Sequence, residues 1–446
     1  MNHAEHTDAC LARMNAHMHD VNAMITVDAA AARTVARAAD DAAHAQRWLG
    51  LLHGVPMVVK DNIDTAGLRT TCGSRFFEHH VPNHDAPVVR RLRAAGAVIL
   101  GKSTLHEFAF GIRSNNPVAG QCRNPWDLER IPGGSSGGSG AAVAMDMCIA
   151  ALGSDTGGSI RLPAAFNGIS GLRPTVGRVP NAGCMPVCAS QDTIGPMARS
   201  VADLARVFSV IAGADADDPS SVDAPLGNFL PHLGDGVAGV RIGIPRNHYL
   251  EGVDREIADA VMAAARVLES LGARLVDVTV PGAEQMHEFA TVVIFADACA
   301  LHAQRLQSDP DRFDAQVLAR MRMGLAYTAV DYANAMRARE QWRHRLGQVF
   351  ETVDLILSPT VHTRVPPIAE DKSLLEATRD ATRNTYAGAF GQLPGLSVPC
   401  GFTSDGLPVG LQLEARWWRE PLLLRAGHAY QQHTDWHERR PPLRDR

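Results

Sequence analysis

One segment, residues 131–159, carries glycine and serine at both ends and constrains the fold more than any other part of the chain. It reads IPGGSSGGSGAAVAMDMCIAALGSDTGGS. Its interior predicts a helix of small residues over Ser139–Asp146 and then a buried strand over Cys148–Gly153. A flexible linker would have nothing to bury. We therefore expect this segment to be packed inside a folded unit, with each glycine cluster at a turn.

Phosphate binding is the first interpretation of the glycine clusters. A P-loop requires a Lys-Ser/Thr pair after its glycines, and a dinucleotide site requires G-x-G-x-x-G between a strand and a helix. GGSSGGSG is followed by no lysine, does not spell the dinucleotide pattern and is preceded by no clear strand. Asp155 does lie about twenty positions on, where a dinucleotide site has an acid. A non-catalytic nucleotide-binding or accessory protein remains the alternative from a different class.

A serine nucleophile is the second interpretation. The run around Ser135 matches G-x-S-x-G, but the charged, proline-containing stretch before it is a poor strand for the elbow of that motif. Ser159 follows a predicted strand and a glycine turn, at the start of a predicted helix, Ser159–Phe166. It is either the N-cap of that helix or a nucleophile beside free backbone N–H groups. Those N–H groups, which suit an oxyanion hole, belong to Thr156, Gly157, Gly158 and Ser159.

A serine nucleophile needs a base, and Lys60 is a candidate. It ends an apolar run over Val55–Val59, which predicts a short buried strand. A lysine with an ordinary pKa of about 10.4 is almost wholly protonated at pH 7. Burial that lowers this pKa to about 7–8 would make Lys60 a usable base. The alternative is an ordinary solvated lysine.

Helical and strand patterns alternate along the rest of the chain, which predicts a layered α/β fold with a largely buried sheet. Two helices are expected within residues 9–48, with a break near Thr26–Asp28. Residues 214–231 are expected to form a surface loop. Further expected elements are helices over Pro87–Ala95, Asp254–Leu271 and most of 284–350, strands over Ala97–Lys102, Val237–Ile244, ARLVDVTVP and VDLILSPT, and a hairpin turning at Ser404–Gly406.

Composition excludes several classes of protein. The chain has 446 residues, a net charge of −5 and 5% aromatic residues, which argues against nucleic-acid binding by charge or by base stacking. The N-terminus has no signal-peptide core, and no run approaches the roughly 18 apolar residues of a membrane span. Eight scattered cysteines indicate free thiols. We expect a cytoplasmic protein, folded as one unit, with no membrane or nucleic-acid partner.

Several motifs together resemble the amidase signature family. They are HGVPMVVKDNIDTAG, GKSTLHEFAFG, NPWDLERIPGGSSGGSGAAVA, GSDTGGSIRLPAAFNGISGLRPT, DTIGPMARSVADLA and GLPVGLQL. The resemblance covers nearly the whole chain, and the intervals of 75 residues from Lys60 to Ser135 and 24 from Ser135 to Ser159 fit the family pattern. It implies a single domain over 1–446, with a central, mostly buried mixed sheet covered by helices on both faces. Residues 1–48 would form a helical segment, and the mostly helical region 284–385 would form much of the pocket wall.

The resemblance also implies roles for individual residues. Ser159 resembles the nucleophile, Ser135 the bridging serine, which follows a cis peptide bond, and Lys60 the base. Glycines 133 and 134 would allow that backbone conformation. The implied reaction is amide hydrolysis through an acyl-enzyme, with protons relayed by Ser135 and no metal or organic cofactor. Further implied residues are the oxyanion-hole members Thr156, Gly157 and Gly158 and the supporting residues Asp155 and Arg161.

The substrate is less constrained than the reaction. The main hypothesis is an amidase that cleaves a linear carboxylic amide, a small molecule, to an acid plus ammonia or an amine. A hydrolase of a urea-derived acid (allophanate or carboxybiuret type) and the glutaminase subunit of a tRNA amidotransferase are alternatives. A glutaminase is expected to carry an acid near Arg419, which weakens that alternative. A homodimer is a further expectation from the resemblance.

Two local features bear on the pocket. AGAFGQLPGLSVP has Ala389 and Gln392 where relatives often carry Asn and Gly, which indicates a reshaped pocket. Arg416, Arg419 and the two tryptophans between them either favour an anionic or aromatic amide or form an amphipathic surface loop.

Overall fold

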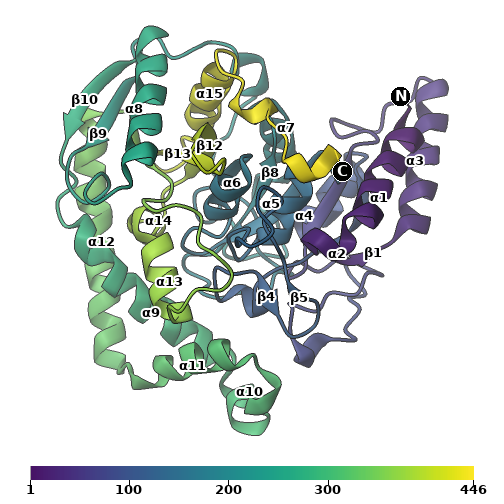
Figure 1. Cartoon of the computed structure of the whole chain (residues 1–446), viewed down its shortest axis with the longest axis horizontal. Helices are drawn as coiled ribbons and strands as arrows, with labels where there is room; N and C mark the ends of the chain where they lie inside the picture. The colour runs from purple at the N-terminus through teal and green to yellow at the C-terminus, as the bar shows by residue number, and fades with distance from the viewer. Residues whose placement is uncertain (1, 446) are drawn as a thin grey trace.

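The computed structural model describes residues 2–445 and is built on one eleven-stranded sheet (Figure 1). Its strands are β1 Met24–Val27, β2 Pro56–Lys60, β3 Val98–Ser103, β6 Ala150–Asp155, β7 Ser170–Arg173, β8 Thr193–Ala198, β9 Arg241–Pro245, β10 Arg274–Val278, β11 Leu355–Pro359, β12 Gly395–Phe402 and β13 Pro408–Ala415. A separate two-stranded sheet consists of β4 Asn115–Asn116 and β5 Gly120–Gln121. The strands of the main sheet come from all parts of the chain.

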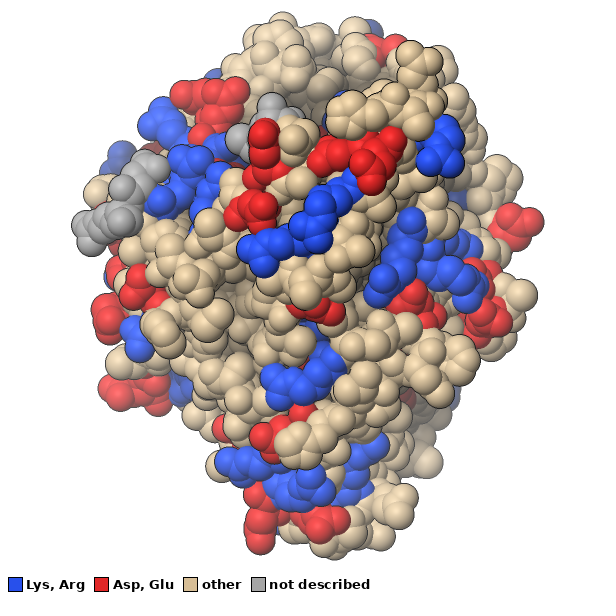
Figure 2. Space-filling view, turned by 90° about the vertical axis from the view of Figure 1, so that its right-hand side faces the viewer, with Lys and Arg blue, Asp and Glu red and all other residues tan. Residues whose placement is uncertain are grey.

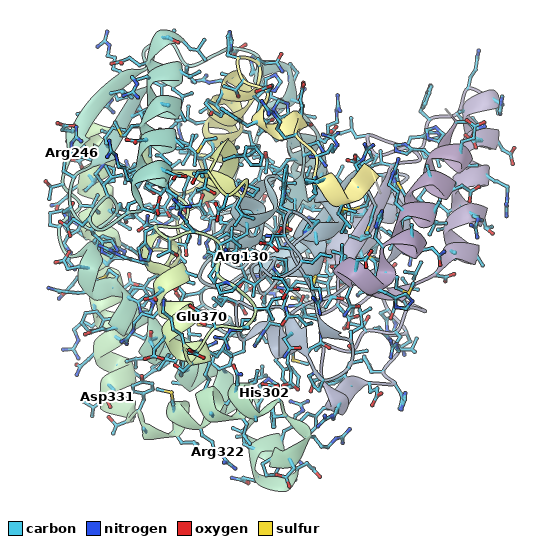
Figure 3. The ribbon with its side chains drawn as sticks, viewed as in Figure 1. Arg130, Arg246, His302, Arg322, Asp331 and Glu370 are labelled. Carbon is cyan, nitrogen blue, oxygen red and sulfur yellow. The ribbon has the colours of Figure 1, made fainter. Side chains whose placement is uncertain are left out.

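Fifteen α-helices surround the sheet within the described residues. They are α1 His3–Ala16, α2 Met18–Val21, α3 Ala29–His44, α4 Pro87–Ala94, α5 Gly137–Ala144, α6 Arg161–Asn167, α7 Val201–Ile211, α8 Arg255–Ser270, α9 Met286–Leu301, α10 Ala303–Ser308, α11 Ala315–Met323, α12 Ala329–Thr352, α13 Leu374–Ala381, α14 Arg383–Phe390 and α15 Glu420–Gln431. Helices α9 to α12 form a layer at the lower left of the view, where Figure 3 labels His302, Arg322 and Asp331.

The main sheet is mixed, as predicted. Its order is β1-β3-β2-β6-β8-β7-β12-β13-β11-β9-β10. Strand β2 runs parallel to both β3 and β6, and β9 runs parallel to both β10 and β11. The strands between β6 and β11 pair antiparallel. The prediction of a mixed sheet flanked by helices is therefore confirmed.

Both faces of the sheet are buried, which the strand residues show directly. Met57 and Val59 of β2 belong to the same apolar cluster as residues of α4, α7, α8 and α15, whereas Val58 belongs to a cluster with α1, α3 and α5. Alternate residues of a strand point to opposite faces. A sheet covered in this way requires nearly continuous apolar strands, and this is the pattern from which β2, β3 and β6 were predicted.

Helix α5 lies unusually close to the chain beside it, and its glycines explain why. A Cβ atom at Gly138 would lie 2.4 Å from the carbonyl oxygen of Ala23 and 2.5 Å from the nitrogen of Thr104. All eight residues of α5 are buried. The small side chains of this helix therefore serve close packing.

The structure corrects the sequence analysis at three places. The break expected near Thr26–Asp28 is the edge strand β1, which pairs antiparallel with β3. Strands β7 and β8 were not predicted, because glycine interrupts both and proline also interrupts β8. The helix expected to begin at Ser159 begins at Arg161. In β1, β7 and β8, pairing with a neighbouring strand outweighs the weak β-strand propensity of the local sequence.

The outer surface carries mixed charges. Figure 2 shows basic and acidic side chains interspersed over one face, without a large area of a single sign. All eight cysteines are free. Within residues 2–445, no helix combines the length and apolarity that a bilayer crossing requires.

Candidate active site

Lys60 is the last residue of β2 and is fully buried. Its Nζ donates to Ser135 Oγ at 2.7 Å, to Ser154 Oγ at 2.8 Å and to the Ser154 carbonyl at 3.3 Å. No carboxylate of the described residues forms an ion pair with it. Burial lowers the pKa of Lys60 to about 7, although Cys184, Asp155 and Asp192 oppose this effect through their charges. A substantial fraction of Lys60 is therefore neutral at pH 7.

Ser135 lies in the first glycine cluster, directly before α5. The Gly134–Ser135 peptide bond is cis, as the resemblance implies. Gly133 has φ of +77°, a conformation that favours glycine. A Cβ atom at Gly134 would lie 2.7 Å from the backbone of Ile112. The two glycines are therefore needed to bring the backbone into the position that places Ser135 against Lys60.

Ser159 lies in the second glycine cluster and is partly exposed, unlike Lys60 and Ser135. It lines a small cavity of about 30 Å³. Its carbonyl accepts the N–H of Ser136 at 3.2 Å, which ties the two glycine clusters together. No hydrogen bond joins the Ser159 and Ser135 hydroxyls within residues 2–445. The N-cap position of α6 is Ile160, with no side-chain cap, so the structure does not support the N-cap alternative for Ser159.

The turn before Ser159 presents backbone N–H groups. The N–H of Gly158 donates to Asp155 Oδ1 at 2.7 Å and is therefore already used. Within residues 2–445, the N–H groups of Thr156, Gly157 and Ser159 have no hydrogen-bond acceptor. A Cβ atom at Gly157 would lie 2.0 Å from the ring of Tyr386, so this turn also depends on glycine.

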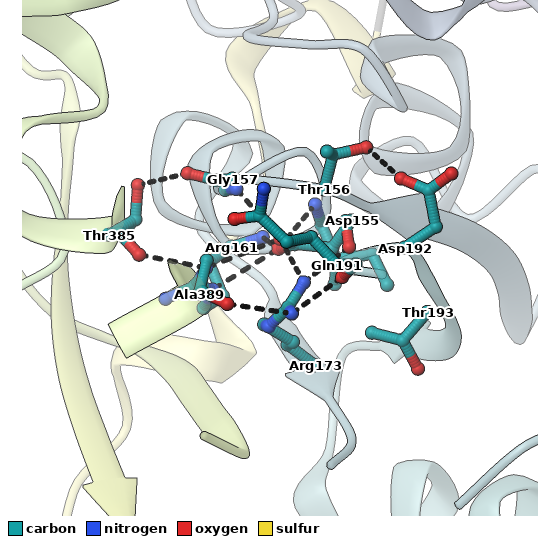
Figure 4. A network of polar contacts seen from close by, with 12 residues as sticks. Asp155, Thr156, Gly157, Arg161, Arg173, Gln191, Asp192, Thr193, Thr385 and Ala389 are labelled. Atoms are coloured by element: carbon teal, nitrogen blue, oxygen red, sulfur yellow. Dashed lines mark hydrogen bonds and ion pairs between the residues drawn. The ribbon is translucent and has the colours of Figure 1, made fainter. Parts of the chain in front are cut away.

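Asp155 and Arg161 lie in a buried network of charges behind the turn (Figure 4). Asp155 accepts from Arg161 Nε at 3.1 Å and from Arg173 Nη1 at 3.0 Å. It also accepts the backbone N–H groups of Gly158 and Ile160. Burial alone would raise the pKa of Asp155, but the two guanidinium groups hold it well below its usual range. The carboxylate therefore orders the turn that carries Ser159.

Arg161 is fully buried, and its guanidinium donates hydrogen bonds to several protein groups. Besides Asp155, it donates to Gln412 Oε1 at 2.9 Å and lies 3.4 Å from Glu414 Oε1. Burial raises the pKa of Glu414 to about 7, and Arg161 opposes that shift. The supporting position expected for Arg161 fits these contacts, and a direct substrate contact does not.

Sequence analysis missed several residues of the site. Ser154 precedes Asp155 in β6 and contacts Lys60, and a strand that alternates between two buried faces is the signal that could have identified it. Arg173 and Asp192 lie in two of the motifs quoted above, but the sequence analysis assigned them no role, and the fold brings both to the turn. Asp192 accepts from the Thr156 hydroxyl at 2.5 Å.

Arg320 of α11 was also missed, and it lines the cavity that holds Ser159. It is 4% exposed, and its Nη1 donates to the Phe110 carbonyl at 2.8 Å. Its guanidinium lies over the rings of Phe110 and Phe295, at 4.4 and 5.0 Å. Within residues 2–445 it has no ion-pair partner, and its Nε has no hydrogen-bond acceptor. A nearly buried cation without a carboxylate partner therefore lines the same cavity as the candidate nucleophile.

The cavity draws its walls from distant parts of the chain. Ile294, Arg320, Thr378 and Thr382 come from the helical region 284–385. The remaining lining residues are Ala109, Phe110, Gly111, Ile112, Thr156, Gly157, Ser159, Val187 and Tyr386. No Asp or Glu of the described residues belongs to this lining.

The loop at 416–419 does not line this cavity. Trp418 and Arg419 line a different one, with Phe229 and Arg425, and Trp417 Nε1 donates to the Gly391 carbonyl at 2.7 Å. Ala389 and Gln392 are also absent from the lining around Ser159. The structure therefore favours the surface-loop interpretation of residues 416–419.

Comparisons with known proteins agree with this geometry. The Amidase family profile matches residues 5–424. A glutamyl-tRNA(Gln) amidotransferase subunit from Roseiflexus castenholzii is 42% identical, and the match covers 99% of this chain and 94% of that one. The chain also superimposes, with a TM-score of 0.92, on a protein from a vestigial complex connected with the origin of an s-triazine catabolic enzyme. The two are 32% identical, and the match covers 97% of this chain and 96% of the other. The peptide amidase PAM gives a TM-score of 0.87 at 32% identity, with 99% and 96% covered.

Proposed function

The chain belongs to the Amidase family of amide-hydrolysing enzymes, and on that premise we propose that it hydrolyses amides bearing a carboxylate through a Ser159 acyl-enzyme. The observation that carries the proposal is the 2.7 Å contact from Lys60 Nζ to Ser135 Oγ, beside the loop of Ser159, in a site that lowers the pKa of Lys60 to about 7. A buried lysine of this kind is a general base at neutral pH.

The proposed reaction uses residues of this chain alone. Neutral Lys60 takes a proton from Ser135, which takes one from Ser159, and Ser159 Oγ attacks the amide carbon. The N–H groups of Thr156, Gly157 and Ser159 hold the oxyanion. Gly158 is left out of this set because its N–H donates to Asp155. The proton returns through Ser135 to the leaving nitrogen as the C–N bond breaks, and water then hydrolyses the ester by the same relay.

Arg320 supports the choice of substrate. A guanidinium with no protein carboxylate partner, in a cavity lined by Phe110, Ile294 and Tyr386, would be paired by an anionic group of the substrate. Carboxylates match the fork of a guanidinium. The substrate is therefore proposed to carry its carboxylate on the acyl side, away from the scissile amide.

Ammonia release from matched amides tests the proposal. Wild-type protein is expected to hydrolyse glutaramic acid at least tenfold more efficiently in kcat/KM than the neutral amide valeramide, and Ser159→Ala is expected to be inactive. Arg320→Met should reduce that preference, while Arg322→Met, in the same helix but outside the cavity lining, should keep it. Equal rates for wild type and Ser159→Ala would refute the proposed reaction. An unchanged preference in Arg320→Met would refute the carboxylate contact.

A glutaminase subunit of an amidotransferase is the second candidate, and the 42% identical relative favours it over a free-standing amidase. Arg320 would suit the carboxylate of glutamine equally well. However, no acidic side chain of residues 2–445 lines the Ser159 cavity to meet its ammonium group. Comparing glutamine with glutaramic acid, which lacks that group, separates the candidates. A preference for glutamine, or activity only with a partner subunit, would favour the glutaminase.

A further inference from the structure

A cavity of about 350 Å³ lies between the segment of residues 225–232 and the start of α15. Trp418 and Arg419 line it, and neither has a part in the proposed reaction. It shares no lining residue with the cavity that holds Ser159. Its volume falls within the range of about 300–1,000 Å³ that small-molecule sites occupy. The cavity can therefore hold a ligand of its own, separate from the amide substrate.

Arg178 joins the two walls of this cavity. Its side chain is fully buried, and its Nη1 donates to the Ala224 carbonyl at 2.6 Å, next to the wall of residues 225–232. In the other wall, its guanidinium lies 4.8 Å from the centre of the Trp418 ring, and its Nη2 donates to the Trp418 carbonyl at 3.4 Å. Glu420, at the start of α15, pairs with the same guanidinium at 3.4 Å. The protein itself therefore holds both walls in place.

Most of the lining is apolar. Phe229 is buried and belongs to a large apolar cluster beside the sheet, and Leu226 and Leu422 pack against that cluster. Aromatic rings in such a cavity pack against one another in stacked or edge-to-face arrangements. The apolar lining residues are Pro225, Leu226, Phe229, Trp418, Pro421 and Leu422. This wall favours a ligand with an aromatic body.

The rest of the lining is basic and consists of His232, Arg419 and Arg425. Within residues 2–445, neither arginine side chain has an ion-pair or hydrogen-bond partner, and Arg425 Nε is buried without an acceptor. A buried N–H donor without an acceptor costs free energy, which a ligand that accepts from it recovers. His232 Nδ1 lies 3.0 Å from Asp235 Oδ2. The two arginines are therefore the groups available to an anion.

The acids around this cavity already have partners. No Asp or Glu of the described residues lines it, and Glu420 pairs with Arg178. The pKa of Asp354 is lowered by its hydrogen bonds from Arg241, one of them 2.9 Å long, and more weakly by the charge of Arg419. The two guanidinium groups of the lining thus remain largely uncompensated. Apolar walls of low dielectric strengthen the field of such charges and attract counter-ions.

We propose that this cavity binds an aromatic anion, such as an aryl carboxylate, at a site separate from the one that holds Ser159. The ring packs against Trp418 and Phe229, and the carboxylate pairs with Arg419 and Arg425. A bare inorganic anion leaves the apolar wall unused, and a neutral arene leaves the guanidinium groups unpaired. The site does not depend on the proposed reaction, because the two cavities have no lining residue in common.

Isothermal titration calorimetry of the full chain with 2-naphthoate tests the site. One molecule is expected to bind per chain, roughly tenfold or more tightly than either neutral 2-naphthylmethanol or inorganic phosphate. Arg425→Met keeps an apolar stem in the wall and is expected to weaken 2-naphthoate binding by a factor of roughly ten or more. Arg416→Met lies in the same loop as Arg419 but outside the lining, so the affinity should not change.

Several outcomes would overturn the proposal. They are the absence of saturable 2-naphthoate binding, equal affinity for 2-naphthylmethanol, and unchanged affinity in Arg425→Met. Arg419 is exposed, so Arg419→Met tests the same contact if Arg425→Met does not fold, and an unchanged affinity there would also refute it. Binding that is lost in Arg320→Met but kept in Arg425→Met would place 2-naphthoate in the Ser159 cavity. That result would refute this site while supporting the carboxylate contact of the proposed function.

Discussion

Lys60 and Arg161 are both fully buried basic residues, but only Arg161 has carboxylate partners. Their partners are adjacent residues of β6, because Ser154 contacts Lys60 and Asp155 contacts Arg161. Lys60 has only hydroxyl and carbonyl acceptors, so burial lowers its pKa to about 7. Arg161 has Asp155 and Glu414, and its charge is compensated. A buried lysine without a carboxylate partner has a lowered pKa and can act as a base. A buried arginine paired with carboxylates keeps its charge and holds the surrounding structure in place.

The same contrast predicts opposite effects on activity and stability. An uncompensated buried cation lowers stability at neutral pH, because the unfolded state binds a proton that the folded state releases. A compensated pair loses stability only when one partner is removed. Substitutions at the two sites should therefore separate function from folding.

Replacing Lys60 should have the largest effect on rate. Lys60→Met removes the proposed base at similar volume and should reduce kcat on the order of 10⁴-fold. The free energy of unfolding should rise by about 1–4 kcal/mol, because a buried ionisable group is replaced by an apolar one. Steady-state kinetics and urea denaturation measure the two quantities. Lower stability together with near-normal activity would contradict the contrast.

Replacing Asp155 should give the largest loss of stability. Asp155→Asn leaves the buried Arg161 and Arg173 without their shared carboxylate and should lower the free energy of unfolding by about 3–5 kcal/mol. The exposed pair of Arg33 and Asp8, with side chains 44% and 55% exposed, provides the control. Asp8→Asn should change stability by less than about 1 kcal/mol. If both variants lost a similar amount of unfolding free energy, the buried network would not be a special source of stability.

The residues of the candidate site differ in how well the sequence predicts them. Lys60, Ser135, Ser159 and Asp155 lie in local motifs, and the apolar run before Lys60 predicted its burial. Arg320 lies in helix α11, where it resembles a surface residue in the sequence, and only the fold places it in the lining of the cavity that holds Ser159.

The strands of the sheet also differ in how well the sequence predicts them. Strands with continuous apolar runs, such as β2 and β3, were predicted to within a few residues. Strand β7 carries glycine and strand β8 carries glycine and proline, and both form because neighbouring strands pair with them on both sides. Which faces meet, which charges pair and where a cavity opens depend on contacts between segments far apart in the chain, and local patterns hold little information about them.

The pH dependence of the wild-type rate is the third prediction. Activity requires neutral Lys60, so kcat/KM should fall about tenfold per pH unit below pH 7 and reach a plateau above pH 8, with a midpoint near the Lys60 pKa of about 7. Initial rates between pH 5 and 9 with a carboxylate-bearing amide measure the profile. A flat profile, where chemistry limits the rate, would contradict the role of Lys60.

Removing the hydroxyl of Ser154 should produce the smallest effect and tests the origin of that midpoint. Ser154 Oγ accepts from Lys60 at 2.8 Å and so stabilises the protonated lysine. Its loss in Ser154→Ala should lower the Lys60 pKa and move the midpoint toward lower pH. The shift should stay below about one unit, because one such hydrogen bond contributes about 1 kcal/mol and one pKa unit corresponds to about 1.4 kcal/mol. Ser154→Thr retains a hydroxyl and should restore the wild-type midpoint. A shift toward higher pH would mean that Ser154 stabilises neutral Lys60, so that burial alone does not explain why this cation acts as a base.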